Sequence, residues 1–300
     1  MTYSIVAFDP TTGELGVAVQ SRWFSVGSGV PWVEPGVGAV ATQSFTEEAH
    51  GPDGLGLMRE GRTAAEALAQ VLASDPGEAV RQVGMVDARG SAAAHTGARC
   101  VRYASHLVGD GVAVQANMME RPTVPAAMLA AFGGTDGDLA ARLVAALFAA
   151  EGEGGDVRGR QSAALVVASG PGSGSTPQPW ARRFDVRVED HRSPVDELAR
   201  ILSVARAYEA MDEAEAAGGR GDLAAAAAAS ERSRALAPDD DQILLWHAVG
   251  LALAGRVDQA RAELARATEA EPRAGEHLRR FAEQGHLPGG DAVLQAMGLR

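Results

Sequence analysis

The chain of 300 residues contains no lysine, so all 27 of its basic side chains are arginines. This absence excludes Schiff-base chemistry on a lysine, a lysine general base and a phosphate-binding loop that depends on lysine. Any cation in an active site must therefore be arginine or histidine. Cys100 is the single cysteine, which also excludes an intrachain disulfide and a cysteine-based zinc cluster.

Long apolar runs and basic runs are missing as well. No stretch of 18 or more apolar residues exists, and residues 1–30 lack a basic segment followed by an apolar one. Neither a membrane span nor a secretion signal is therefore predicted. The net charge of −12 argues against nucleic acid and an anionic membrane surface as partners. We expect a cytoplasmic protein whose hydrophobic content of 46% suffices for a core.

Motifs for metal or nucleotide binding are also missing. None of the seven histidines forms a His-x-x-x-His or His-Glu-x-x-His pattern. The Gly- and Pro-rich residues 169–179 are predicted to be a loop, because no helix or Gly-Lys-Ser follows them as a phosphate cradle requires. We therefore expect no metal and no organic cofactor.

Residues 1–192 alternate β-rich runs with Gly-rich turns. Strands are expected at 2–8, 14–21, 37–45, 82–87, 91–97, 111–117, 162–168 and 184–189, and helices at 52–73, 122–132 and 136–151. The turn at residues 9–13 joins the first two strands and places Thr2 opposite Ser21, beside Arg22. Antiparallel hairpins with helices between them predict an α+β layered fold.

Strand signals end near residue 194, where Pro194 is predicted to begin a helix. A Gly-Arg turn followed by an aspartate occurs at 219–222 and again at 255–258, and a proline follows each copy. This layout is typical of tetratricopeptide repeats. We expect a first domain over 1–200 and a helical repeat over 201–300. Because three repeats are usually needed for an independent solenoid, the segment is expected to pack on the first domain, on a second copy in a homodimer, or on a protein partner.

Thr2 is the strongest candidate for chemistry. Bacterial processing removes an initiator methionine before a small residue, and the chain would then begin with a hydroxyl and a free α-amine. The amine can act as the base for its own hydroxyl, which is the arrangement of an N-terminal nucleophile. The alternative is that Thr2 is a β-branched residue that begins a strand.

Further polar residues at strand ends are candidates for the same site. A cation at Arg22 would favour the neutral amine, or else Arg22 is a surface residue. Asn117 could donate to an oxyanion, or form a turn. Arg160 suits a substrate carboxylate, or else pairs with Asp156 or Glu153. The remaining candidates for substrate binding are Ser21, Gln43, Gln161 and Ser162.

Several stretches together resemble one family. They are Thr2–Ala7, Gly13–Val19, Ser21-Arg22, Gly36–Gln43, Val114–Met118, Gly159–Leu165 and Asp185–His191. These motifs, spread over about residues 1–200, are similar to a bacterial and archaeal family known only as a domain of unknown function. That family is grouped with the fold of N-terminal-nucleophile (Ntn) hydrolases. The resemblance implies a four-layer αββα sandwich and cleavage of an amide bond by a terminal Thr, Ser or Cys.

Two functions remain open at this point. One is an amidohydrolase that acts on a small molecule or short peptide through Thr2, with Arg22 in the position that resembles an arginine of the choloylglycine-type enzymes. The other is a catalytically idle sandwich that acts as an assembly module, with the helical repeat holding a peptide or protein partner. Fold membership alone does not decide between them.

Overall fold

The computed structural model describes residues 2–170, 178 and 181–300. The chain forms two compact units, of which one ends at Ala199 and the other begins at Arg200. The first contains antiparallel sheets and helices, and the second is all helical, which confirms the predicted α+β class. The predicted loop at 169–179 lies largely outside the described residues. Within the described ranges, no helix is both long enough and apolar enough to cross a bilayer.

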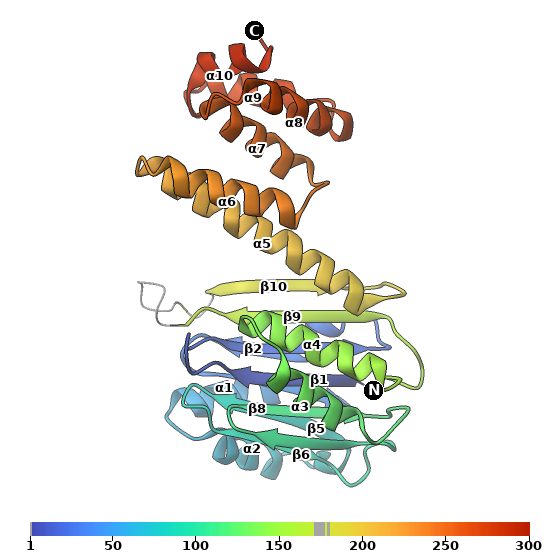
Figure 1. The fold of residues 1–300 in the computed structure, drawn as a ribbon. Coiled ribbons are helices and arrows are strands. Elements are labelled where there is room, and N and C mark those ends of the chain that lie inside the picture. Colours follow the sequence, from blue (N-terminus) through green and yellow to red (C-terminus); the bar gives the residue numbers. More distant parts are fainter. Residues whose placement is uncertain (1, 171–177, 179–180) are drawn as a thin grey trace. The chain divides into compact units, whose positions relative to one another are not determined.

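The larger sheet of the first unit has the strand order β10-β9-β2-β1-β8-β7 (Figure 1). Its strands are β1 (Thr2–Phe8), β2 (Leu15–Ser21), β7 (Ser105–Gly109), β8 (Val112–Asn117), β9 (Ser162–Ala168) and β10 (Arg182–Val188). Each neighbouring pair is antiparallel. The first strand of the chain, β1, is therefore central in its sheet. It lies between β2, which follows it directly in the sequence, and β8, which begins more than a hundred residues later.

A smaller sheet with the order β3-β4-β5-β6 faces the larger one. Its strands are β3 (Pro31–Glu34), β4 (Gly38–Ser44), β5 (Arg81–Asp87) and β6 (Ala92–Thr96). The helices of this unit are α1 (His50–Arg59), α2 (Ala64–Ala73), α3 (Val124–Gly134), α4 (Leu139–Gly152) and the short η1 (Val26–Ser28) and η2 (Glu78–Val80). Helices α1 and α2 cover the smaller sheet, and α3 and α4 cover the larger one. The layer order is αββα, as the resemblance implies.

Strand alternation builds the interior between the sheets, because every second side chain points into it. Val6, Val17 and Val19 of the larger sheet pack there with Ala39 and Ala41 of the smaller one. On the outer face, Gly16 lets α4 approach β2, since a Cβ at this position would lie 2.6 Å from Leu143 Cδ1. Small residues thus set the spacing of the layers.

The helix predicted over 52–73 is wrong in its extent. The structure has two helices there, separated by Gly61 at a φ of 94° and by Thr63, which caps α2. The Thr63 hydroxyl accepts from the Glu66 backbone N–H, while the Glu66 carboxylate accepts from the Thr63 backbone. This capping box is visible in the sequence as Thr-x-x-Glu, and it overrides the continuous apolar stripe.

Two strands were not predicted. β3 is only four residues long and begins with Pro31, which weakens the strand signal. β7 lies at the edge of the larger sheet, where Leu107 and Val108 are exposed, so it lacks alternation between a buried and a solvated face.

The second unit contains helices that pack around a core of their own. Helix α5 (Pro194–Gly219) begins just before Arg200 and continues into this unit. The helices that follow it are α6 (Leu223–Leu236), α7 (Asp241–Leu253), α8 (Val257–Ala270), α9 (Ala274–Glu283) and α10 (Gly290–Met297). The predicted start of a helix at Pro194 is confirmed. The two repeated aspartates differ in role, because Asp222 caps α6 whereas Asp258 lies inside the first turn of α8. The tetratricopeptide assignment stays a prediction.

Candidate active site

Thr2 is the first residue of β1, and its two neighbours across the sheet are far apart in the sequence. It pairs with Ser21 of β2 on one side and with Asn117 of β8 on the other. The pairing with Ser21 confirms the register predicted from the hairpin turn. The Thr2 hydroxyl donates to Ser21 Oγ over 3.0 Å, and both side chains are buried. Three predicted site residues are therefore adjacent at one end of the sheet.

The side chains between the two sheets change from apolar to polar toward this end of the sandwich. Alternation directs Thr2 and Ser4 into the same layer as Val6. The layer is apolar around Val6, but near Thr2 and Ser4 it is filled by amide side chains. These are Gln43, Gln82, Gln115 and Asn117, each at most 1% exposed. Buried polar groups are costly unless they are hydrogen-bonded, so this polar layer requires a network.

Gln43 of β4 connects the two sheets at Thr2. Its Nε2 lies 3.2 Å from the Thr2 carbonyl oxygen and 2.8 Å from Gln82 Oε1, and its Oε1 accepts from Ser4 Oγ over 2.7 Å. One side chain of the smaller sheet thereby fixes the backbone of β1 in the larger one. The sequence predicts that Gln43 reaches the cleft of Thr2, and the structure shows a contact with the Thr2 carbonyl.

Gln115 continues the polar layer and explains a glycine on the facing sheet. Its Nε2 donates to Ser4 Oγ over 2.6 Å. A Cβ at Gly84 of β5 would lie 2.2 Å from Gln115 Oε1, so only glycine leaves room for this amide. Gly84 therefore makes room for the polar layer on the facing sheet.

The side-chain amide of Asn117 is hydrogen-bonded through its nitrogen but not through its oxygen. Its Nδ2 donates to Gln82 Oε1 over 2.8 Å and to the Thr2 carbonyl oxygen over 3.3 Å. Its Oδ1 is buried and has no hydrogen-bond partner among the described residues. In this structure the amide therefore positions Thr2 and presents a free acceptor. The role of oxyanion donor stays a prediction, and it requires one of these hydrogen bonds to be exchanged.

Backbone strain gathers at the same end of the sheets. Ser25, Ser44 and Met118 are non-glycine residues with φ values of 54°, 76° and 55°. Met118 directly follows Asn117, Ser44 directly follows Gln43, and Ser25 lies in the turn beyond β2. A left-handed conformation costs a non-glycine residue about 1–3 kcal/mol and is often found at functional sites. The strained positions therefore mark the same end of the sandwich as the polar layer.

Arg22 directly follows Ser21, the last residue of β2, and has an exposed side chain. Its backbone N–H donates to Asp156 Oδ2 over 3.2 Å, and its Nη1 donates to the Arg160 carbonyl oxygen over 3.1 Å. Asp156 is buried and forms an ion pair with Arg158 at 2.8 Å. The Arg22 guanidinium has no carboxylate partner among the described residues, and its backbone directly follows Ser21, the strand partner of Thr2.

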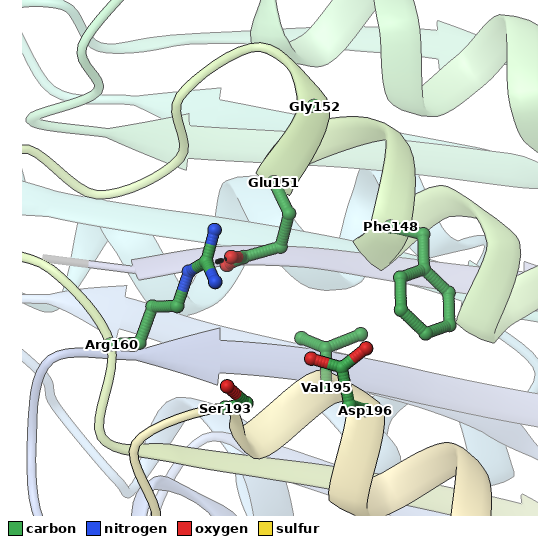
Figure 2. Close-up of a pocket in the computed structure, with 7 residues that line it drawn as sticks. All are labelled: Phe148, Glu151, Gly152, Arg160, Ser193, Val195 and Asp196. Atoms are coloured by element: carbon green, nitrogen blue, oxygen red, sulfur yellow. Dashed lines mark ion pairs between the residues drawn. The ribbon is translucent and has the colours of Figure 1, made fainter.

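Arg160 occupies a different face from the Thr2 hydroxyl. Its guanidinium forms an ion pair with Glu151 (Figure 2). Glu151 also accepts a hydrogen bond from the Tyr3 hydroxyl. Since Tyr3 and Thr2 are consecutive in β1, their side chains point to opposite faces of the sheet. Burial raises the pKa of Glu151 and of Tyr3. The alternative ion pair of Arg160 with Asp156 or Glu153 is wrong, because Glu151 of α4 is the partner.

Gln161 and Ser162 have structural contacts in this structure. The Gln161 carbonyl accepts from the His191 backbone N–H over 2.7 Å. Ser162 pairs with Ser21 and is fully buried; its hydroxyl donates to the Trp23 carbonyl and accepts from the Val26 N–H. Ser162 therefore shapes the turn that follows Ser21. The predicted substrate contacts of Arg160, Gln161 and Ser162 stay predictions.

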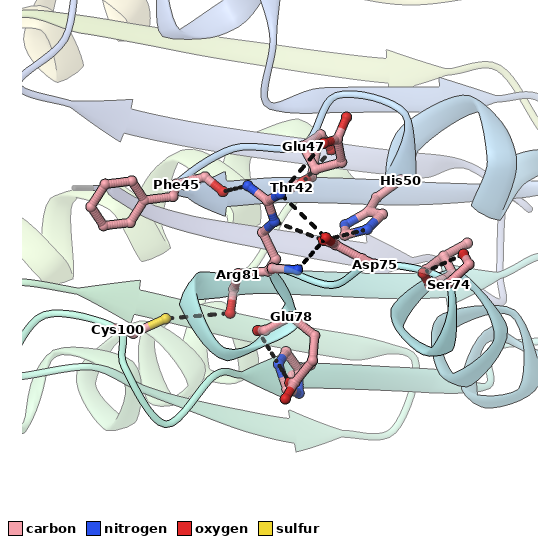
Figure 3. Close-up of polar contacts among 12 residues, drawn as sticks. Thr42, Phe45, Glu47, His50, Ser74, Asp75, Glu78, Arg81 and Cys100 are labelled. Atoms are coloured by element: carbon pink, nitrogen blue, oxygen red, sulfur yellow. Dashed lines mark hydrogen bonds and ion pairs between the residues drawn. The ribbon is translucent and has the colours of Figure 1, made fainter.

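A charged cluster holds the segment that follows β4 (Figure 3). Arg81 donates to the Phe45 carbonyl over 2.7 Å and pairs with Asp75 at 2.7 Å and with Glu47 at 3.4 Å. The hydrogen bond from Arg81 lowers the pKa of Asp75. His50 lies 3.2 Å from the same carboxylate, and burial lowers its pKa. The cluster fixes the chain just beyond Gln43.

Sequence reasoning missed Ser4, Gln82, Gln115 and Asp156. A signal was present for two of them: Ser4 lies two residues from Thr2, and Gln115 lies two residues from Asn117, in otherwise apolar strands. Such spacing places both side chains on one face. Which polar faces meet depends on the strand order, which the sequence pattern does not provide.

Comparison with known proteins gives a family without a known reaction. The profile of DUF1028, described as a family of unknown function, matches residues 2–198. A crystal structure of protein SPO2555 from Silicibacter pomeroyi, described as belonging to DUF1028, is similar with a TM-score of 0.60 and 30% sequence identity. The similarity covers 67% of this chain and 87% of that one. No curated protein matches the chain significantly.

Proposed function

This chain belongs to the DUF1028 family of unknown function, as its motifs indicate, and we propose that it is an amidohydrolase with the Thr2 hydroxyl as its nucleophile. The polar layer around Thr2 carries this proposal. The Thr2 hydroxyl is buried at the start of a central strand between Ser21 and Asn117, and Gln43 of the facing sheet donates to the Thr2 carbonyl oxygen. The hydroxyl itself donates to Ser21 Oγ, while Gln43 and Asn117 hold the backbone of the same residue.

In the proposed reaction, Met1 is removed and Thr2 gains a free α-amine. The amine takes the hydroxyl proton while Oγ1 bonds to the carbonyl carbon of the substrate amide, and the carbonyl electron pair moves onto oxygen. The resulting ammonium protonates the departing nitrogen as the C–N bond breaks, which leaves an acyl ester on Thr2. The same amine then deprotonates a water molecule that hydrolyses the ester and restores the hydroxyl.

Nearby residues would support these steps in distinct ways. The uncompensated charge of Arg22 favours the neutral amine, which is the form that accepts a proton. The buried Oδ1 of Asn117 is an acceptor suited to orient that amine. Gln43 holds the Thr2 carbonyl and limits the freedom of the nucleophile. The rigid setting keeps the reacting groups oriented.

The first experiment is the intact mass of untagged full-length protein, followed by a screen of amide substrates with mass detection. We expect a mass without Met1 and turnover that falls about a thousandfold or more in Thr2→Ala. Thr2→Ser keeps a hydroxyl and should retain part of the activity. Thr11→Ala, at an exposed turn residue, serves as the matched control. Retention of Met1, or full turnover by Thr2→Ala, would contradict the proposal.

A second candidate function is the binding of a protein partner by the helical unit, with a second copy of the chain as the proposed partner. The observation in its favour is that Leu223, at the start of α6, and Leu253, at the end of α7, are 73% and 51% exposed. Replacing both by serine should lower the molar mass measured by light scattering without loss of helicity. An unchanged mass would count against this function.

A further inference from the structure

A cavity of about 470 Å³ opens in the segment that crosses from the smaller sheet to the larger one. The segment runs from Thr96, the last residue of β6, to Ser105, the first residue of β7. It lies at the same end of the sandwich as Thr2, because Ser105 pairs with Ala116 and Asn117 pairs with Thr2. The side chains that line this cavity include Thr96, Cys100, Arg102, Tyr103 and His106.

Two side chains separate the cavity wall from the candidate nucleophile. Gln82 Nε2 donates to Thr96 Oγ1 over 2.9 Å and to the Ser105 carbonyl over 3.2 Å. Gln82 Oε1 accepts from Asn117 Nδ2, which also donates to the Thr2 carbonyl oxygen. All of these contacts belong to the polar layer. The cavity is therefore joined to Thr2 by a continuous chain of hydrogen bonds.

Arg102 gives the cavity a positive charge. Its guanidinium lies 4.6 Å from the centre of the Tyr103 ring, and its Nη2 donates to the Tyr103 hydroxyl over 3.1 Å. No carboxylate of the described residues pairs with it, although the chain carries a net charge of −12. A planar guanidinium that is stacked on an aromatic ring and has unused N–H groups is well suited to bind a carboxylate through two hydrogen bonds.

Thr96 and His106 add neutral polar groups to the same wall. Thr96 Oγ1 lies 2.9 Å from His106 Nδ1. Because Thr96 Oγ1 already accepts from Gln82, we assign its proton to the bond with His106 Nδ1, which leaves the ring proton on Nε2. Burial lowers the pKa of His106, which favours this neutral form. His106 is then a hydrogen-bond donor that adds no charge beside Arg102.

We propose that this cavity binds a carboxylate of the substrate through Arg102, so that the substrates are short anionic peptides or similar acyl chains. The strand order sets a lower limit on their length. Thr2 and Ser105 lie two strands apart, or about 10 Å at an interstrand spacing of about 4.8 Å. An extended chain covers this distance with about three residues. This inference rests on the proposed function in one respect, namely that the bound ligand presents its amide bond to Thr2.

The test uses full-length Thr2→Ala protein, which can bind but cannot turn over a substrate. It is incubated with two pools of acetylated mixed-sequence peptides of one to five residues, one pool with free carboxyl termini and the other with C-terminal amides. Retained peptides are identified by mass spectrometry. We expect the acids to be enriched about tenfold over the amides, with the largest enrichment near three residues.

Two further variants in the same background assign this preference to the cavity. Arg102→Gln should abolish the preference for acids, whereas Arg99→Gln removes the same charge three residues away, outside the lining, and should keep it. Equal retention of acids and amides, no retention at all, or a preference that survives Arg102→Gln would overturn the proposal. Acid preference without Thr2-dependent turnover in the unmodified protein would instead refute the proposed function alone.

Discussion

Gln20 of β2 and Gln43 of β4 are both fully buried, but their hydrogen bonding is opposite. Gln43 bonds to Thr2, Ser4 and Gln82, whereas neither side-chain polar atom of Gln20 has a partner among the described residues. Removing a satisfied amide leaves its partners unpaired in the interior, while removing an unsatisfied amide relieves a desolvation cost.

This contrast predicts opposite effects of the same substitution. Gln43→Leu should lower the free energy of unfolding by about 2–4 kcal/mol, because buried polar groups on both sheets lose their partner. Gln20→Leu should leave it unchanged or raise it. Urea denaturation of the full-length variants measures both values. A loss in Gln20→Leu as large as that in Gln43→Leu would show that the amide of Gln20 is paired in solution.

Helix α2 depends on a cap that the apolar pattern conceals. Thr63→Ala should lower the free energy of unfolding by about 1 kcal/mol, because the first turn of α2 loses the hydroxyl that accepts its backbone N–H. Thr11→Ala is the control, since its exposed side chain caps no helix. Equal stability of the two variants by urea denaturation would show that packing of α2 on the smaller sheet makes the cap dispensable.

Local pairing could be predicted from the sequence, and long-range pairing could not. The hairpin of β1 and β2 has a turn of six residues with Pro and Gly, which sets the register of Thr2 with Ser21. The pairing of Thr2 with Asn117 joins strands about a hundred residues apart, and no turn fixes it. Arg160 shows the same limit, because its partner Glu151 comes from a helix on the far face of the sheet from the Thr2 hydroxyl.

Acid should destabilise both units of the chain. Burial lowers the pKa of His50, His106 and His247, so these side chains favour the neutral form in the folded protein. A lowered histidine pKa contributes stability that is fully present above the unfolded value of about 6.5 and is lost as the pH falls below it. Glu151, whose pKa is raised by burial, acts in the opposite direction.

Because three histidines act against one glutamate, the midpoint temperature of thermal unfolding should decrease as the pH is lowered from about 7 to about 5. Differential scanning calorimetry of the full chain at several pH values measures this trend. Asp75, whose pKa is lowered by its hydrogen bond with Arg81, adds a further loss only in more acidic solution. A midpoint that rises toward pH 5 would mean that these imidazoles are not buried in the neutral form.

The position of β1 also determines when Thr2 becomes enclosed during synthesis. Ser21 leaves the ribosome soon after Thr2, but β8, which closes the other side of the strand, follows only after more than a hundred further residues. At typical elongation rates this interval is on the order of ten seconds. An aminopeptidase can reach the terminus during that time, whereas in the finished sheet Thr2 is 4% exposed. Removal of Met1 therefore competes in time with closure of the sheet around Thr2. Slower elongation would increase the fraction of chains that are processed.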